Sequence, residues 1–278
     1  MIGTANVCDC VGVIGASGTG KGVFIAERLA PFLGQRPVTV WSPLEATDRY
    51  ARKFGGVIVR SIPKLIDQVK ARARAAVFVP DDTGRVVEFK GKRRRLFNVQ
   101  FDLFCMVAWN TPRGVVLVEE LSRVTSPSYA PEPWANLSTA GRHRGLTVYG
   151  AAQFPAQIDK SFLGSCTEIR AYRVNEEAHA RTMAGKMRAP WELFLELPDL
   201  HYLHRWVREL RWERGVQAIP GVSPGRVTER GQGAYVPGGT AAPGEASSPP
   251  LDTARGVELN PPRVKRKNIS RRRRRKAP

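Results

Sequence analysis

The sequence predicts an α/β domain with a mainly parallel sheet and helices on both faces of that sheet. Short β-prone segments alternate with segments of helical periodicity through the first 214 residues. Residues 115–118 (Val-Val-Leu-Val) are wholly apolar, as expected for a strand that is covered on both faces. A glycine-rich turn at residues 15–22 separates the first β-prone segment from a helical one. Such an alternation is typical of parallel strands that are joined by helices.

The individual elements follow in order along the chain. Strands are expected at residues 7–14, 37–41, 56–59, 76–79, 85–89, 115–118, 146–152 and 168–174. Helices are expected between the glycine-rich turn and Gly34, and at residues 62–71, 134–144 and 176–187. A second run beside residues 85–89 is expected to begin at Leu96. Residues 203–214 match helical spacing, but the residues before them also fit a final strand, so both interpretations stay open.

Charge and composition divide the chain into three parts. The domain is expected at residues 1–214, and residues 215–262, rich in Gly, Pro, Ser and Ala, are expected to be a disordered linker. Residues 263–278 form a basic tail with ten Lys or Arg and no acid, which leaves +9 of the net charge of +19 for the other 262 residues. This charge favours a polyanionic partner.

Cysteine usage and hydropathy exclude several classes of protein. The four cysteines, Cys8, Cys10, Cys105 and Cys166, form no Cys-x-x-Cys pair and no Cys/His cluster, which argues against a disulfide framework and a zinc site. We expect them to be reduced core residues. The sequence contains no secretory signal and no apolar window of the roughly 18 residues that a membrane span needs. A cytoplasmic protein without a membrane span is therefore expected.

Residues 15–21 (Gly-Ala-Ser-Gly-Thr-Gly-Lys) match the phosphate-binding pattern G-x-x-x-x-G-K between a strand and a helix. Glycines let backbone amides surround phosphates, and the helix N-terminus adds partial positive charge. Lys21 is expected to reach the β- and γ-phosphates of ATP. A dinucleotide-binding turn is disfavoured, because Lys21 follows the last glycine and no acid ends the next strand. The expected binding residues are Gly15, Ala16, Ser17, Gly18, Thr19, Gly20, Lys21 and Gly22.

Gly22 stands where this pattern normally has a serine or threonine that binds Mg²⁺. Magnesium would then be held by water, by a neighbouring hydroxyl such as that of Thr19, or less tightly. Weak hydrolysis, or none, stays open.

Two acids follow the apolar strand at residues 115–118. In one interpretation Glu119 holds Mg²⁺ through water and Glu120 orients the attacking water. In the other, the two acids only begin a helix. Gln153 ends the next expected strand, where it would sense the γ-phosphate, position water or serve only as a loop residue.

These motifs resemble the FtsK–HerA superfamily of DNA-pumping ATPases. Four segments carry the resemblance: residues 15–22, 115–121, 140–155 and 167–180. In the third segment, a basic helix end precedes a strand that is capped by Gln153 and followed by Phe-Pro. The chain looks most like the genome-packaging ATPases of tailless, membrane-containing phages. Related assembly ATPases of the zonula occludens toxin type usually carry a membrane segment.

The resemblance implies a RecA-like P-loop NTPase fold and a ring of identical subunits, with nucleotide at the subunit interfaces. It assigns the phosphate, magnesium, base and sensor roles to Lys21, Glu119, Glu120 and Gln153. Arg142 and Arg144 become candidates for an arginine that acts on the neighbouring subunit's nucleotide, with Arg123 as a weaker third. Gly22 and Glu119 depart from the Ser/Thr and Asp of the family.

Residues 90–95 (Lys-Gly-Lys-Arg-Arg-Arg) place five basic residues at the tip of an expected hairpin. Such a tip is suited to a DNA backbone, although a solvated turn explains it equally well. We therefore expect an ATP-driven translocase of double-stranded DNA, read without sequence preference, in a viral packaging motor. The rivals are an assembly ATPase acting on protein and a nucleotide-binding DNA scaffold. Capsid or vertex proteins are further expected partners, in the host cytoplasm or the virion.

Overall fold

The computed structural model describes residues 9–44 and 49–219. The chain divides into two units, residues 1–226 and 227–278, and all the described residues belong to the first unit. Cys8, the linker from residue 220 onward and the basic tail lie outside the described residues.

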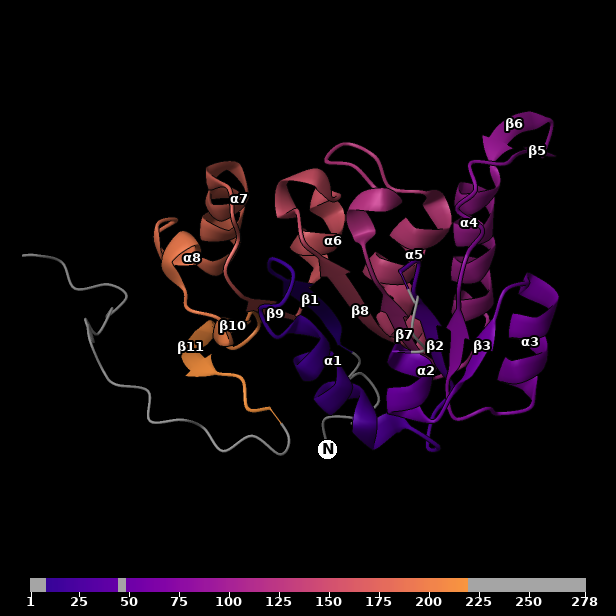
Figure 1. Cartoon of the computed structure of the whole chain (residues 1–278), viewed down its shortest axis with the longest axis horizontal. Helices are drawn as coiled ribbons and strands as arrows, with labels where there is room; N and C mark the ends of the chain where they lie inside the picture. Colours follow the sequence, from indigo (N-terminus) through magenta and orange to yellow (C-terminus); the bar gives the residue numbers. More distant parts are fainter. Residues whose placement is uncertain (1–8, 45–48, 220–278) are drawn as a thin grey trace, which may run out of the picture. The chain divides into compact units, whose positions relative to one another are not determined.

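A nine-stranded sheet forms the centre of the domain (Figure 1). Its strands lie in the order β11-β10-β9-β1-β8-β7-β2-β4-β3. All neighbours from β9 to β3 are parallel, and β10 and β11 are antiparallel additions at one side. The strands are β1 (Cys10–Ile14), β2 (Val38–Trp41), β3 (Val57–Val59), β4 (Ala76–Phe78), β7 (Val115–Val118), β8 (Thr147–Ala152), β9 (Glu168–Ala171), β10 (His201–Trp206) and β11 (Arg211–Val216).

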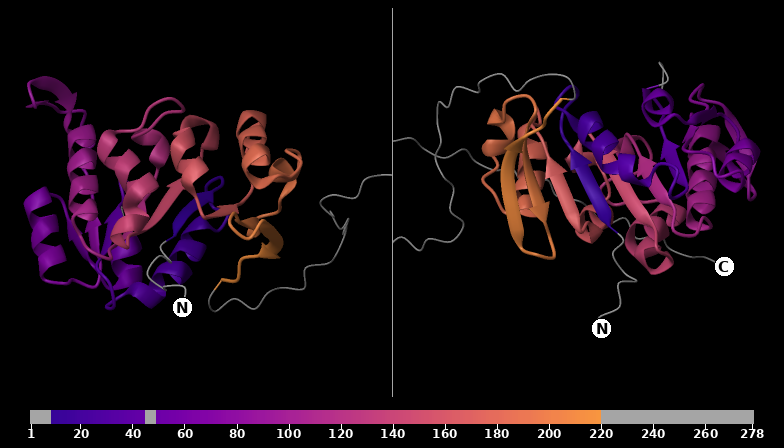
Figure 2. Two further views of the ribbon diagram at one scale, coloured as in Figure 1. Left: turned by 180° about the vertical axis from the view of Figure 1, so that it is seen from behind. Right: turned by 90° about the horizontal axis from the view of Figure 1, so that it is seen from below.

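Helices cover both faces of this sheet, as predicted (Figure 2). One face packs against α1 (Lys21–Leu29) and α2 (Arg49–Phe54). The other packs against α3 (Ile62–Lys70), α4 (Leu96–Trp109), α5 (Glu132–Ala140), α6 (Lys160–Ser165), α7 (Glu177–Met187) and α8 (Leu193–Glu196). Short 3-10 helices are η2 (Ala30–Phe32), η3 (Leu121–Arg123), η4 (Gly141–Arg144) and η5 (Pro155–Gln157). None of the helices among the described residues is long and apolar enough to cross a membrane.

The alternation of side chains along each strand divides the core between the two faces. Val115 and Leu117 of β7 face the α1 side, whereas Val116 and Val118 face the α4 side. All four are fully buried. This double burial explains why the strand carries no polar residue until Glu119.

The basic hairpin differs from its prediction. β5 (Val86–Phe89) pairs with β6 (Lys92–Arg95), so most of the basic residues form the second strand and not only the tip. The segment from Leu96 was expected to extend the hairpin but begins α4 instead. Its apolar residues occur nearly all round the helix, so their spacing does not separate helix from strand. Figure 1 shows the hairpin projecting from the end of α4, apart from the main sheet.

Three further boundaries differ from expectation. Residues 203–214, for which the sequence left helix and strand undecided, belong to the antiparallel pair β10–β11. β11 reaches Val216, and Gln217 is buried, so regular structure continues past residue 214. The helix expected at residues 134–144 is regular only to Ala140 and continues as η4.

A pair of glycines tests the packing on the α6 side of the sheet. A Cβ on Gly150 in β8 would lie 2.3 Å from Cζ of Phe162 and 2.8 Å from Cδ1 of Leu121, whereas a Cβ on Gly164 in α6 meets no atom within 4 Å. We expect Gly150→Ala to lower the free energy of unfolding by about 1–3 kcal/mol through overpacking. Gly164→Ala is expected to be neutral or to stabilise by up to about 1 kcal/mol. Urea denaturation of the two variants checks this, and equal midpoints would contradict it.

Candidate nucleotide-binding site

The register of the central strands brings the predicted site residues to one edge of the sheet. Ile14, the last residue of β1, pairs with Ala152 of β8 and with Ala171 of β9. The residues that follow these three positions, Gly15, Gln153 and Tyr172, are therefore neighbours at the carboxyl edge. Glu119 follows β7, the strand on the other side of β8.

The phosphate loop connects β1 to α1, as the motif predicts. Gly18 and Gly20 have φ values of 79° and 111°, in the left-handed region that favours glycine. The amides of Val23 and Phe24 donate to the Gly20 carbonyl at 3.0 and 3.2 Å, so α1 begins directly at the last glycine of the loop. A helix N-terminus that follows a glycine-rich loop is the general arrangement of an anion site. At Gly15 the requirement for glycine is steric, because a Cβ there would lie 2.6 Å from Cβ of Tyr172.

Lys21 lies folded over its own loop. Its Nζ donates to the carbonyl oxygens of Gly15 at 2.6 Å and Ala16 at 2.7 Å. Burial lowers the pKa of Lys21 to about 8, although Glu120 and Glu119 oppose this shift. The lysine is thus a largely buried group whose present partners are two neutral carbonyls, and a phosphate at the loop would favour its charged form.

The first turn of α1 offers no hydroxyl to a metal. Among the described residues, a Cβ on Gly22 would meet only the Tyr50 hydroxyl, at 4.0 Å. The hydroxyl of Thr19 donates to the Ala16 carbonyl at 2.8 Å, and the residue is 1% exposed. A hydroxyl that donates a hydrogen bond keeps its oxygen lone pairs, so Thr19 and water both stay candidates for holding the metal.

Glu119 continues the β7 ladder, with its amide donating to the Trp41 carbonyl at 3.0 Å. Its carboxylate accepts short hydrogen bonds from Tyr50 and Arg49 of α2, and Ser42 Oγ lies 3.4 Å away. Burial raises the pKa of Glu119 more strongly than Arg49 and Tyr50 lower it. The sequence did not indicate Arg49 or Tyr50, because each lies about 70 residues from Glu119.

The backbone of Glu120 leaves the extended conformation of the strand. Its φ of 52° and ψ of 51° are left-handed, a conformation in which non-glycine residues are strained. Gln153 Nε2 donates to Glu120 Oε1 at 2.7 Å. Glu120 and Gln153, which the sequence brings together only through the expected order of the strands, are thus in direct contact at the carboxyl edge.

The aromatic ring of Tyr172 lies beneath the phosphate loop. A Cβ on Gly20 would be 3.2 Å from Cε1 of Tyr172, and the tyrosine hydroxyl donates to Gln217 Oε1 at 3.1 Å. Gln217 Nε2 in turn donates to Glu27 of α1 at 2.8 Å. Neither Tyr172 nor Gln217 was identified from the sequence, since no local pattern marks a residue that supports a loop.

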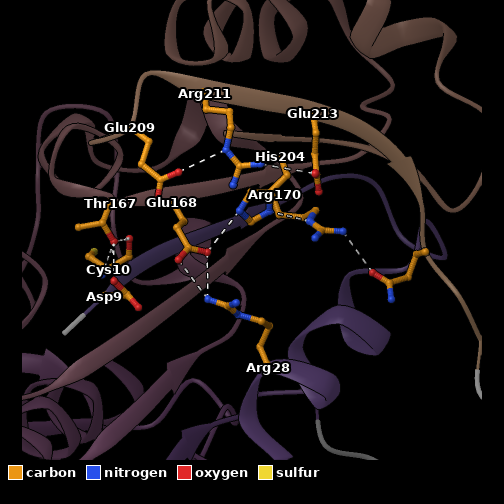
Figure 3. A network of polar contacts seen from close by, with 11 residues as sticks. Asp9, Cys10, Arg28, Thr167, Glu168, Arg170, His204, Glu209, Arg211 and Glu213 are labelled. Carbon is orange, nitrogen blue, oxygen red and sulfur yellow. Dashed lines mark hydrogen bonds and ion pairs between the residues drawn. The ribbon is translucent and has the colours of Figure 1, made fainter. Parts of the chain in front are cut away.

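A buried polar network fixes the other end of α1. Figure 3 shows the Glu168 carboxylate between the Arg28 guanidinium and the His204 ring. Arg28 Nη2 binds both carboxylate oxygens at 3.0 and 3.1 Å, and His204 Nε2 lies 3.3 Å from Oε2. Burial lowers the pKa of His204, so the ring is neutral and accepts from Arg170 Nε at Nδ1, 2.9 Å away. Helix α1 is therefore anchored to β9 and β10 along its length.

The candidate arginines lie at two opposite edges of the sheet. Arg142 and Arg144 are in η4, before β8, at the amino edge, and the Arg144 guanidinium lies 5.0 Å from the Trp109 ring centroid. The six residues of β8 separate them from Gln153, a span of roughly 20 Å. They cannot reach the phosphate loop of their own subunit. Arg123 lies at the carboxyl edge but is paired with Asp82 and packs on Phe97.

The donor set at this edge suits magnesium better than a transition metal. Within residues 9–44 and 49–219, no group of three or more His, Cys, Asp or Glu side chains forms a metal site. Magnesium is commonly held by one or two carboxylates together with substrate phosphates, and Glu119 is a carboxylate of this kind.

Comparison with known proteins gives a relative by sequence and several similar folds. No protein-family model matches the chain. Protein P9 of Pseudoalteromonas phage PM2 is 29% identical over 179 residues, which cover 63% of this chain and 73% of that protein.

Two solved structures have a similar fold. The genome packaging NTPase B204 from Sulfolobus turreted icosahedral virus 2, in complex with ATP-gammaS, matches 78% of this chain and 100% of its own, with a TM-score of 0.59 and 15% identity. VirB4 of Thermoanaerobacter pseudethanolicus matches 79% and 92%, with a TM-score of 0.58 and 11% identity. The chain therefore has the RecA-like P-loop NTPase fold, and the solved structures that it resembles include a viral genome packaging NTPase.

Proposed function

We propose that this protein is an ATPase that moves double-stranded DNA, as the motor of viral genome packaging. The observation that carries the proposal is the meeting of Lys21, Glu120 and Gln153 at one edge of the sheet, with Gln153 bonded to Glu120 at 2.7 Å. This set supplies a phosphate cradle, a base and a residue that contacts the base. The fold shared with a genome packaging NTPase supports the packaging role.

Hydrolysis requires that ATP and magnesium replace some of the hydrogen-bond partners that the site residues have within the protein. When ATP enters, Lys21 leaves the carbonyls of Gly15 and Ala16 and binds the β- and γ-phosphates. Glu120 orients the attacking water and accepts its proton, while Gln153 holds the Glu120 carboxylate in place. Magnesium, when bound with the nucleotide, neutralises charge on the phosphates. Glu119 would hold it through water, once the bonds from Arg49 and Tyr50 rearrange.

Hydrolysis is proposed to occur between subunits of a homo-oligomeric ring. Arg142 and Arg144 lie at the edge opposite their own phosphate loop, so any contact they make with a nucleotide must be with that of a neighbour. Strand β8 joins them directly to Gln153. A shift of Gln153 on phosphate release would therefore be carried along one rigid element to the arginines that act on the next site.

The charge of the protein supports DNA as the substrate. The net charge is +19, and the tail at residues 263–278 and the β5–β6 hairpin are the most basic segments. Of the five basic residues at positions 90–95, four form strand β6. Binding through such segments neutralises phosphates without reading bases, which suits a motor that must act on any sequence. Capsid or vertex proteins remain the proposed partners at the site of packaging.

A nucleotide-gated DNA scaffold is a second candidate function. Two observations favour it: Gly22 lacks the usual magnesium-binding hydroxyl, and the Glu119 carboxylate is occupied by Arg49 and Tyr50. A protein of this kind would bind ATP and change its hold on DNA with little hydrolysis.

The translocase proposal predicts that double-stranded DNA stimulates ATP hydrolysis. We expect Glu120→Gln to retain ATP binding but to lower the rate at least about 100-fold, because the substitution keeps the shape and removes the base. Phosphate release with and without duplex DNA measures both effects. Hydrolysis that DNA does not stimulate would indicate a protein cargo, and no hydrolysis in either condition would leave the scaffold.

The pKa of Lys21 predicts proton uptake on ATP binding. With a pKa of about 8, Lys21 is mostly neutral at pH 8.5 in the free protein, and adjacent phosphates raise its pKa and return its charge. Binding should therefore take up a proton at pH 8.5 but little at pH 7, and affinity should fall above pH 8. Lys21→Arg should remove this dependence, since arginine stays charged. Calorimetry in two buffers of different ionisation enthalpy checks this, and buffer-independent heats at pH 8.5 would refute it.

The space at Gly22 predicts that Gly22→Ser restores a magnesium ligand without damage. Only the Tyr50 hydroxyl lies within 4.0 Å of the added Cβ, and serine is favoured over glycine in a helix. The variant should hydrolyse ATP at a lower magnesium concentration, with an unchanged or higher Tm. Titration of Mg²⁺ against rate measures this. Loss of activity in a stable variant would mean that the loop is built around glycine.

A further inference from the structure

Arginine is concentrated in the loops that lead into the sheet at its amino edge, opposite the phosphate loop. Among the described residues, these loops contain seven arginines and two acids. The arginines are Arg36, Arg72, Arg74, Arg113, Arg142, Arg144 and Arg208, and the acids are Asp9 and Glu209. Glu209 is itself paired with Arg211. This edge therefore has a strong excess of positive charge, of which only Arg142 and Arg144 have a proposed role at a nucleotide.

Part of this edge forms a cavity of about 570 Å³ between the ends of α3 and α4. Four cations are among its eleven lining residues, and no acid and no aromatic ring is present in the lining. Arg36 has a structural role there. Its guanidinium donates to the carbonyls of Arg113, Gly114 and Gly145 at 2.6, 3.2 and 2.8 Å, and so fixes two loops of the edge.

The other three cations of the cavity are exposed. Lys70 ends α3, Arg72 follows it, and Arg113 precedes β7. Within residues 9–44 and 49–219, the ion pairs of the structure include none of these three. Arg72 and Arg113 also have φ values of 54° and 56°, a strained conformation outside glycine. Like charges held together in this way repel one another unless an anion lies between them.

We propose that the cavity formed by Lys70, Arg72 and Arg113 binds the phosphate backbone of duplex DNA. This inference rests on the proposed function and identifies a surface at which the DNA is held. The lining has no aromatic ring on which a base could stack, so it suits a backbone better than a free nucleotide. Arginine also matches phosphate oxygens with two parallel N–H donors.

The extent of the basic edge favours a polymer as the ligand. The seven arginines of these loops form a row along the amino edge. From Arg208, beside β10, to Arg72, beside β4, this row crosses six strand spacings of about 4.8 Å, or roughly 29 Å. The field of the whole row attracts a polyanion of similar length. Arg142 and Arg144 lie within the row and keep their proposed role at the neighbour's nucleotide. The DNA contact is assigned to the cavity alone.

Salt-dependent binding of the full chain to a fluorescent duplex, without nucleotide, tests the assignment. The test variant is Lys70→Gln/Arg72→Gln/Arg113→Gln. The matched control, Arg60→Gln/Lys64→Gln/Lys160→Gln, removes three exposed cations at the carboxyl edge. A third variant, Lys92→Gln/Arg93→Gln/Arg95→Gln, removes exposed cations of the hairpin.

The expected result is a change in the slope of log K against log salt. Each phosphate contact contributes about 0.9 to this slope, so the slope of the test variant should be shallower by roughly 2–3. The control should keep the wild-type slope, and all variants the wild-type Tm.

The outcomes separate the two proposals. If the test variant keeps the wild-type salt slope, the cavity assignment is overturned. A shallower slope of the hairpin variant would then place the DNA contact at the hairpin. Either result is compatible with the proposed translocase. A wild-type chain that does not bind duplex DNA would overturn the proposed function as well. Competition by poly-glutamate that is lost in the test variant, together with an unchanged DNA slope, would assign the cavity to an acidic protein instead.

Discussion

The covering of both faces of the parallel sheet is the constraint on which the rest of this structure depends. Each strand of the centre buries side chains above and below, as in β7, where all four residues are fully buried. A polar group in such a strand would lose its hydration without gaining a partner, at a cost of roughly 1–3 kcal/mol or more. In β1, β2, β4, β7 and β8, charged groups are therefore absent from the strands and lie at the two edges, where the strands begin and end.

At the candidate nucleotide site, Lys21, Glu119 and Glu120 each have a partner within the protein before any nucleotide is present. Lys21 is bonded to loop carbonyls, Glu119 to Arg49 and Tyr50, and Glu120 to Gln153. Nucleotide binding is thus an exchange of hydrogen bonds and not a gain of new ones, which keeps the net free energy small compared with the individual bonds. The lowered pKa of Lys21 and the raised pKa of Glu119 have the same origin, because burial disfavours both charged forms.

The two edges are mechanically connected. Strand β8 begins after Arg142 and Arg144 and ends just before Gln153, which contacts Glu120, so one short strand spans from the candidate nucleotide site to the arginine-rich edge. Arg36 ties the loop before β8 to the loop before β7 through their carbonyls. A change at the nucleotide can therefore reach the amino edge through packed secondary structure, with no flexible segment in between. In the proposed motor, β8 and the loops at its amino edge would connect the nucleotide, with or without its γ-phosphate, to the surface that holds the DNA.

The sequence by itself determined the parallel sheet, the phosphate loop at residues 15–22 and the position of the two acids after β7. Each of these depends on residues adjacent in the chain: an apolar strand, a glycine-rich turn, a helix start. The contact between Glu120 and Gln153 was within reach as well, because the order of strands places their ends together. The helix at Leu96 was missed, since an element that is apolar nearly all round has no distinctive period.

Only the tertiary structure decided which groups surround the chemistry. Arg49 and Tyr50 on Glu119, and Tyr172 and Gln217 beneath the loop, come from segments that are distant in sequence and carry no motif. The concentration of Lys70, Arg72 and Arg113 at one cavity likewise depends on strand order, because each residue alone is an ordinary surface cation. Local patterns report how a segment folds, whereas the partners of a side chain are set by packing between segments, which no local pattern contains.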